Sequence, residues 1–165
     1  MNSFTCSASP AQPAIYKNGQ KDGIWVQIAE SGDTLHITTY REGNEEGLQV
    51  RFDRETGSRL KEYYKKNNRY DGLYREYDPS TGELVHEATY EFGRLNGKAK
   101  SLVRDNRFDY WETSTYVNGR QTGPFESRYV KNDRVRETGT YRNGHRTGRW
   151  KRYDINGKLE MEWEE

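Results

Sequence analysis

The sequence predicts an all-β fold: an elongated, single-layer antiparallel β-meander of about six hairpin repeats. Three observations lead to this prediction. A segment that begins with Tyr recurs every 24 to 26 residues, turn signals of the Asn-Gly type recur with it, and the residues between turns alternate in polarity. The apolar spacing of an amphipathic helix is absent, and copies this short leave no room for a crossover helix. We therefore expect about twelve strands, all paired antiparallel.

The last copy, residues 141–154, shows the repeat most clearly: Tyr-Arg-Asn-Gly-His-Arg-Thr-Gly-Arg-Trp-Lys-Arg-Tyr-Asp. The copies begin at tyrosines spaced 24, 24, 26, 26 and 25 residues apart, namely Tyr16, Tyr40, Tyr64, Tyr90, Tyr116 and Tyr141. A second glycine follows the tyrosine by 7 residues in five copies and by 8 in the third, which has Asn67 and Asn68 near the turn. The third copy is expected to contain either a one-residue bulge or a left-handed asparagine.

Each copy is predicted to contain two strands and two turns. In the first copy, residues 24–28 alternate with period two, residues 30–33 form a turn cluster, and residues 35–40 are rich in β-branched and aromatic side chains. The second glycine of each copy begins a strand, where glycine indicates a bend or a close backbone approach. Either the tyrosine that ends one repeat packs over this glycine, or the glycine only relieves a turn.

Composition supports an ordered repeat array with little aliphatic core. The chain has 31% hydrophobic and 32% charged residues, which alone would suggest disorder, but it also has 13 Tyr, 5 Phe and 4 Trp. In a single layer, Tyr and Trp suit both faces because each ring has an apolar body and a polar tip. The net charge of +1 provides no general attraction to nucleic acid.

Residues 1–15 are predicted to be a flexible leader before the repeat domain, residues 16–165. Their Ser, Ala and Pro after Cys6 also fit the start of a processed lipoprotein, although no apolar segment precedes Cys6. We expect a cytoplasmic protein, with a periplasmic or envelope-anchored location as the alternative if Cys6 carries lipid.

The repeat resembles the MORN repeat family, and most closely its bacterial variant form, Tyr-x-Asn-Gly-Lys-x-x-Gly-x-Trp-x-x-Tyr. The resemblance covers residues 16–165 and implies an antiparallel sheet of MORN-type hairpins. The fourth copy departs most, with Ala99 in place of an aromatic residue and Leu102 in place of a tyrosine; a weaker sheet or a site for a partner is expected there. The matching residues are Tyr16, Asn18, Gly19, Gly23, Trp25, Tyr40, Gly43, Gly47, Tyr64, Gly72, Tyr74, Tyr77, Tyr90, Gly93, Gly97, Tyr116, Asn118, Gly119, Gly123, Phe125, Tyr141, Asn143, Gly144, Gly148, Trp150 and Tyr153.

No catalytic, metal-binding or cofactor-binding motif is present in the sequence. His36, His86 and His145 lie in different copies without the spacing of metal ligands, and Cys6 has no positioned base. We therefore predict a protein that is not an enzyme and holds no metal or cofactor.

Binding to a protein partner is the function that remains, since Trp, Tyr and Arg dominate interface hot spots. Trp111 is the strongest candidate because it does not recur between copies, whereas the repeat-equivalent aromatic residues could simply pack against neighbouring repeats. The candidate partner-binding residues are Tyr74, Tyr77, Trp111, Phe125, Tyr129, Trp150 and Arg152.

The resemblance implies two specific functions. Bacterial proteins of this type are similar to antitoxin or immunity components, so the first expectation is neutralisation of a cognate toxin by direct binding. The second is a membrane-associated scaffold that binds phospholipid headgroups through the basic fifth and sixth copies. A lipoprotein tethered through Cys6 is a weaker third reading, and the sequence leaves the oligomeric state open.

Overall fold

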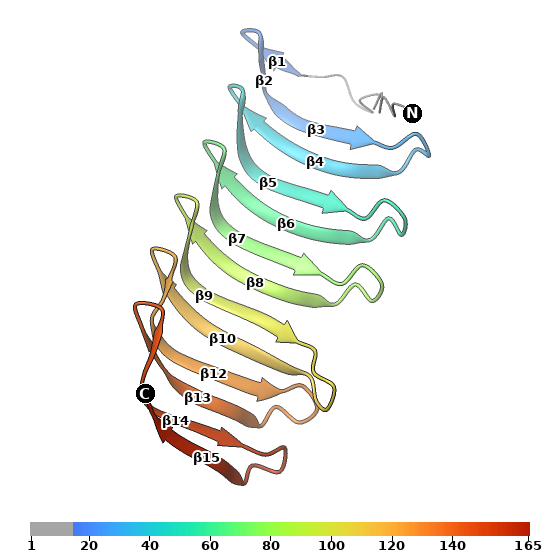
Figure 1. The fold of residues 1–165 in the computed structure, drawn as a ribbon. Helices are drawn as coiled ribbons and strands as arrows, with labels where there is room; N and C mark the ends of the chain where they lie inside the picture. Colours follow the sequence, from blue (N-terminus) through green and yellow to red (C-terminus); the bar gives the residue numbers. More distant parts are fainter. Residues whose placement is uncertain (1–14) are drawn as a thin grey trace, which may run out of the picture. The chain divides into compact units, whose positions relative to one another are not determined.

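A computed structural model describes residues 15–165, which form strands and turns without a helix (Figure 1). The strands make a 13-stranded antiparallel meander that does not close on itself, which confirms the predicted all-β fold class. Cys6 and the rest of the predicted leader up to residue 14 lie outside the described residues. The chain divides into two units, residues 1–84 and 85–165, which are described in turn.

The first unit contains seven strands, of which the first two form a separate two-stranded ribbon. The others pair with their sequence neighbours. The strands are β1 (Tyr16–Lys17), β2 (Gln20–Lys21), β3 (Gly23–Ile28), β4 (Thr34–Arg41), β5 (Asn44–Phe52), β6 (Arg59–Lys66) and β7 (Arg69–Tyr77).

The second unit continues the same pattern from a strand that begins at its boundary. Two-residue turns lie along one edge of this unit and longer loops along the other (Figure 1). The strands are β8 (Leu84–Glu91), β9 (Arg94–Val103), β10 (Tyr110–Val117), β11 (Arg120–Gln121), β12 (Gly123–Tyr129), β13 (Val135–Arg142), β14 (His145–Tyr153) and β15 (Leu159–Glu164).

The two-residue turns have the backbone conformation predicted from the Asn-Gly signals. Both central residues have positive φ, for example 51° at Asn118 and 80° at Gly119, as a type I′ hairpin turn requires. The same holds where the first residue is not asparagine, since Phe92 has φ 49° before Gly93. The tight turn therefore forms at the same place in each repeat even where its first residue is not asparagine.

The third copy uses left-handed asparagines, which resolves the irregular spacing in the sequence. Asn67 and Asn68 have φ of 49° and 64°, so they form the same turn as the glycine-containing copies. Lys65 pairs with Tyr70 just as Tyr40 pairs with Glu45 in the copy before it. The prediction that Tyr64 opens this copy is therefore wrong, because Lys65 occupies the equivalent position.

In the first four copies the second glycine of the hairpin is faced not by the residue that opens the copy but by the residue before it, namely Ile15, Thr39, Tyr64 or Thr89. In the last two copies nothing lies within 4 Å of a Cβ built on Gly123 or Gly148. A Cβ built on Gly97, whose φ is 120°, would lie 3.1 Å from Cβ of Thr89. At Gly72 the facing residue is Tyr64, in the position that Thr89 has in the next copy. All six second glycines have positive φ, and in the first four copies the glycine also allows the close approach of the neighbouring strand.

The longer loops are closed by aspartate side chains that accept backbone hydrogen bonds. Asp53 Oδ1 accepts from the backbone N–H groups of Glu55 and Thr56 at 3.0 and 2.8 Å. Asp154 Oδ1 accepts from Asn156 and Lys158 in the same way. These bonds replace the backbone pairing that the turn interrupts, and they fix the loop edge of each unit.

All buried side chains of the second unit lie on one face of its sheet, which we call the aromatic face. Along β12, Phe125, Ser127 and Tyr129 are buried and alternate with more exposed residues, as the period-two pattern predicts. The buried residues of this unit are Ala88, Ala99, Tyr110, Ser114, Phe125, Ser127, Tyr129, Glu137 and Trp150. A single layer thus protects one face by packing its own side chains against one another.

Trp150 is the centre of this packing and has no solvent exposure. Its indole lies flat over Gly139 on the neighbouring strand, so that a Cβ at Gly139 would be only 2.1 Å from the ring. Phe125, Tyr141 and Trp163 surround it with ring centroids 5.4, 5.2 and 6.1 Å away. The close approach is possible only because position 139 has no side chain.

Candidate binding face

A polar row crosses the aromatic face of the second unit, with one residue from each of the strands β8, β9, β10, β12, β13 and β14. The members are direct cross-strand partners, so their side chains are neighbours. In strand order from β8 to β14 the row consists of His86, Ser101, Glu112, Ser127, Glu137 and Arg152. It brings together residues that are widely separated in the sequence and share no obvious motif.

Three arginines surround the buried carboxylate of Glu137. The Glu137 side chain is only 3% exposed, and its Oε2 lies 2.7 Å from Nη2 of Arg152. Its Oε1 lies 3.1 Å from Nη2 of Arg146, and Arg136 Nη1 is 3.7 Å from Oε2. A buried carboxylate is expensive to desolvate, so this arrangement depends on its charge-assisted hydrogen bonds.

The same arginines cover aromatic rings with their flat guanidinium groups. The Cζ atom of Arg146 is 4.1 Å from the ring centroid of Trp150, and that of Arg136 is 3.9 Å from Tyr110. Arg152 lies 5.7 Å from the Trp163 ring. The side chains of Arg146 and Arg152 remain 37% exposed. They therefore present a partly exposed arginine layer stacked on tryptophan.

A hollow of about 240 Å³ lies beside this layer, where the fourth copy lacks an aromatic residue. Ala88, Ala99 and Ser114 are direct neighbours on β8, β9 and β10, so three adjacent strands have small side chains in one row. We call this space the Ala99 hollow. Its lining consists of His86, Leu95, Ala99, Ser101, Glu112, Ser114, Tyr116, Gln121, Phe125, Tyr141 and Arg146.

Hydrogen bonds between the lining residues hold the polar rim of the hollow in place. Gln121 Nε2 donates to Ser114 Oγ at 2.6 Å. His86 Nδ1 and Ser101 Oγ are 2.8 Å apart, a cross-strand contact between register partners. Burial raises the pKa of Tyr116, so its hydroxyl keeps its proton at neutral pH. The rim therefore offers fixed polar groups around a floor of small side chains.

Glu112 differs from the other polar groups on this face. Its carboxylate makes no hydrogen bond or ion pair with any residue in the described range 15–165. Burial raises its pKa, Arg136 and Arg146 oppose the rise from a distance, and Glu137 adds to it. The neighbouring hydroxyl of Ser127 is fully buried and has no hydrogen-bond partner among the described residues. The face thus has hydrogen-bonding capacity that its own residues do not use.

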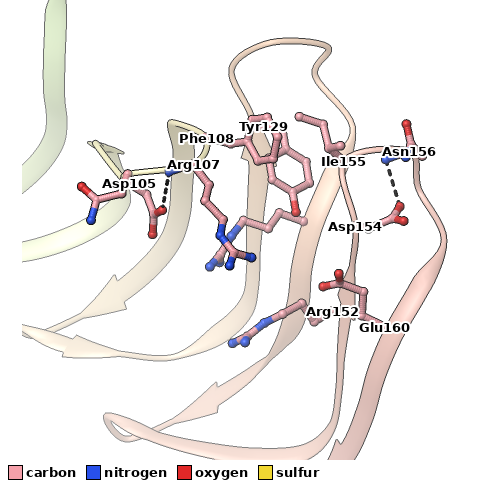
Figure 2. Close-up of a pocket in the computed structure, with 11 residues that line it drawn as sticks. Asp105, Arg107, Phe108, Tyr129, Arg152, Asp154, Ile155, Asn156 and Glu160 are labelled. Carbon is pink, nitrogen blue, oxygen red and sulfur yellow. Dashed lines mark hydrogen bonds between the residues drawn. The ribbon is translucent and has the colours of Figure 1, made fainter.

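A second and larger hollow, about 510 Å³, lies at the loop edge of the second unit (Figure 2). Figure 2 shows Arg107 and Arg152 extending into the space between the loop of Asp105 and the segment with Asp154 and Glu160. Here the exposed ring of Phe108 packs edge-on against Tyr129, 5.9 Å away. Alternating acidic and basic groups around an aromatic pair suit the polar rim of a protein interface.

The predicted site residues are divided between the two units and between buried and accessible positions. In the second unit, Phe125, Tyr129 and Trp150 are buried, so they support the aromatic face from within. Arg152 belongs to the arginine layer. Trp111 lies on the opposite face, where the ammonium group of Lys100 is 4.4 Å from its ring centroid.

The two remaining candidates lie in the first unit and pack there. Tyr74 stacks on Tyr63 with centroids 5.9 Å apart, and its hydroxyl bonds to Glu76 Oε1. Tyr77 donates from its hydroxyl to Glu62 Oε1 at 2.7 Å. These tyrosines therefore take part in the internal packing of their own unit.

Sequence reasoning did not single out Glu112, Glu137, Arg136, Arg146 or Ser114 as site residues. A signal for the hollow was present, because Ala99 stands at a position where four other copies have a ring and the second copy has Gln49. Charged residues are so numerous that no pattern distinguishes Glu137 from its neighbours before the register is known.

Residues 15–165 contain no group of three His, Cys, Asp or Glu side chains placed to hold a metal ion. The described part of the chain also contains no helix long and apolar enough to span a bilayer. Comparison with protein-family models and with curated proteins returns no match for this chain. The likeness to MORN repeats therefore rests on the repeat residues themselves.

Proposed function

We propose that this protein is a non-catalytic protein-binding repeat module that uses the aromatic face of its second unit. The observation that supports the proposal is the exposed arginine layer stacked on tryptophan, with Arg146 4.1 Å above Trp150. Tryptophan, tyrosine and arginine are the residue types that contribute most to interface affinity. The Ala99 hollow and the larger hollow at the loop edge each include arginines of this layer among their lining residues, Arg146 in the first and Arg152 in the second.

The partner class that we propose is a toxin, which the module neutralises by direct binding as an immunity protein or antitoxin. This choice follows from the resemblance to bacterial variant MORN repeats. The repeat array offers a broad platform, and repeat proteins commonly bind other proteins along such extended surfaces.

Coexpression with the product of the neighbouring gene tests the proposal. We expect the two proteins to copurify and this chain to restore growth if its neighbour is toxic. Arg146→Ala should weaken binding by at least about tenfold, as loss of a hot spot does. Arg149→Ala is the matched control, since Arg149 is 68% exposed and pairs with Glu162 outside the layer. Absence of copurification and of growth rescue would refute the proposal.

The alternative is a membrane-associated scaffold, and one feature of the second unit favours it. Arg94, Arg120 and Arg142 lie along its turn edge and form no ion pair within residues 15–165. Two of them line a shallow hollow of about 400 Å³. Liposome flotation with and without anionic lipid separates the alternatives, because headgroup binding requires anionic lipid and weakens with salt.

A further inference from the structure

The Ala99 hollow corresponds to one missing aromatic ring. In the hairpin β12–β13 the ring of Phe125 stands opposite Gly139, and in β14–β15 Trp150 stands opposite Trp163. In β5–β6 of the first unit the ring comes from the second strand, with Tyr63 opposite Gln49. In β9–β10 the same pair is Ala99 and Ser114, and neither has a ring.

The size and walls of the hollow suit an aromatic side chain. A cavity of about 150 Å³ is enough to hold benzene, and this one measures about 240 Å³. The aromatic residues Phe125, Tyr141 and Tyr116 are among those that line it, and Ala99 and Ser114 are buried there. Aromatic pairs gain stability beyond area burial when their rings meet edge to face or offset.

The polar rim favours a ring with a hydrogen-bond donor. Glu112 lines the hollow, is half-buried, and has no hydrogen-bond or ion-pair partner within the described residues 15–165. The first unit shows how such a carboxylate is used, since the hydroxyl of Tyr74, at the position equivalent to Ala99, bonds to Glu76. A hydroxyl that enters the hollow would meet a carboxylate in a comparable setting.

We propose that the Ala99 hollow receives a tyrosine side chain from the partner protein. The tyrosine ring packs over Ala99 and Ser114, and its hydroxyl donates to the carboxylate of Glu112. This inference rests on the proposed function, which it extends by naming the anchor residue of the partner. It also gives a physical role to the departure of the fourth copy from the repeat.

The test uses the chain alone with three small probes: N-acetyl-tyrosinamide, N-acetyl-phenylalaninamide and N-acetyl-leucinamide. Titrations followed by amide NMR should show saturable shifts centred on Ala99, Ser101 and Ser114. We expect the tyrosine probe to bind at least about threefold tighter than the phenylalanine probe and about tenfold tighter than the leucine probe. Scattered shifts, or equal affinity for all three probes, would overturn the proposal.

Variants that fill the hollow from within provide the decisive comparison. Ala99→Phe should weaken the tyrosine probe at least tenfold, and Ser114→Phe, which fills the same space from the opposite strand, should do the same. Lys98→Phe places a ring on the other face and should leave binding unchanged. Glu112→Met removes the acceptor and should abolish the preference for tyrosine over phenylalanine. Unchanged binding in both filled variants would rule the site out.

Two further outcomes separate the tyrosine site from self-association of this chain and from the proposed binding of a toxin. Concentration-dependent self-association that Ala99→Phe abolishes would assign the hollow to a second copy of this chain and overturn the partner anchor. A toxin that copurifies while the tyrosine probe fails to bind would leave the proposed function standing and refute only this inference.

Discussion

Gly139→Ala is the substitution that tests the packing of the aromatic face most sharply. The new methyl group would lie 2.1, 2.2 and 2.5 Å from three atoms of the Trp150 indole, against an ordinary contact of 3.4–4 Å. The indole is rigid, fully buried and enclosed by three other rings, so it has no space into which to move. Gly139 does not have positive φ, so the substitution adds a steric clash without backbone strain.

The expected cost is about 3 kcal/mol, the upper end of the range for overpacking a core. For a chain of this length, that loss corresponds to a fall of roughly 6–12 °C in the melting temperature. Gly148→Ala provides the contrast, since Gly148 has φ 64° and no atom within 4 Å of a built Cβ. That substitution should cost about 1–2 kcal/mol through backbone conformation alone.

Thermal and urea unfolding of a double-mutant cycle with Trp150→Leu would measure the clash. In the Trp150→Leu background, Gly139→Ala should cost less than about 1 kcal/mol, which gives a coupling of about 2 kcal/mol. Gly148→Ala should cost the same in both backgrounds. Additive effects of Gly139→Ala and Trp150→Leu would refute the packing described for this face.

Three further predictions concern single polar residues. Glu137→Gln should lower the free energy of unfolding, measured in urea, by about 3–5 kcal/mol, because it leaves three arginines around an uncharged buried group. Glu126→Gln, at an exposed ion pair, should lower it by less than about 1 kcal/mol. Similar losses in the two variants would contradict the stabilising role of the arginine cluster around Glu137. The folded pKa of Glu112 is raised, so the stability linked to its protonated form is lost as pH rises through that pKa. Glu112→Gln should therefore gain in melting temperature relative to the wild type as pH rises above the ordinary glutamate pKa of about 4.3, and a pH-independent difference would refute this. Asn68→Gly keeps the left-handed turn but removes two hydrogen bonds to the preceding turn, one of 2.8 Å from the backbone N–H of Glu45 and one of 2.7 Å to Asn44 Oδ1. It should therefore lower the free energy of unfolding by about 1–2 kcal/mol in the same assay. Asn143→Gly should leave that free energy almost unchanged.

The local chemistry of the hairpins could be predicted from the sequence. Asn-Gly at residues 118–119 requires positive φ at both positions, and period-two alternation places Phe125 and Tyr129 on one face; the structure confirms both. Alignment on the tyrosines places the start of the third copy at Tyr64, one residue too early, because Lys65 has the position that tyrosine has in the other copies. The turn is the better fixed point, since two left-handed residues and a glycine five positions later keep their spacing in every copy.

The candidate site depends on cross-strand register, which the sequence does not specify. Register shifts recur near the turn end of the hairpins, for example between Thr138 and Thr140. Gly139 lies at this shift, and only there can it face Trp150. The ion pair of Glu137 with Arg152 depends on the register of β13 with β14, and the opposition of Ala99 and Ser114 depends on that of β9 with β10, so period-two alternation alone could not reveal them.

Copurification of the neighbouring gene product with wild-type and Ala99→Phe protein tests the central claim most directly, since it asks whether the ring-sized space on the aromatic face is what the partner recognises. Lys98→Phe serves as the matched control on the opposite face. We predict that the wild type and Lys98→Phe retain the partner and that Ala99→Phe loses it while its melting temperature is unchanged or raised. Equal retention of the partner by all three proteins would contradict the account.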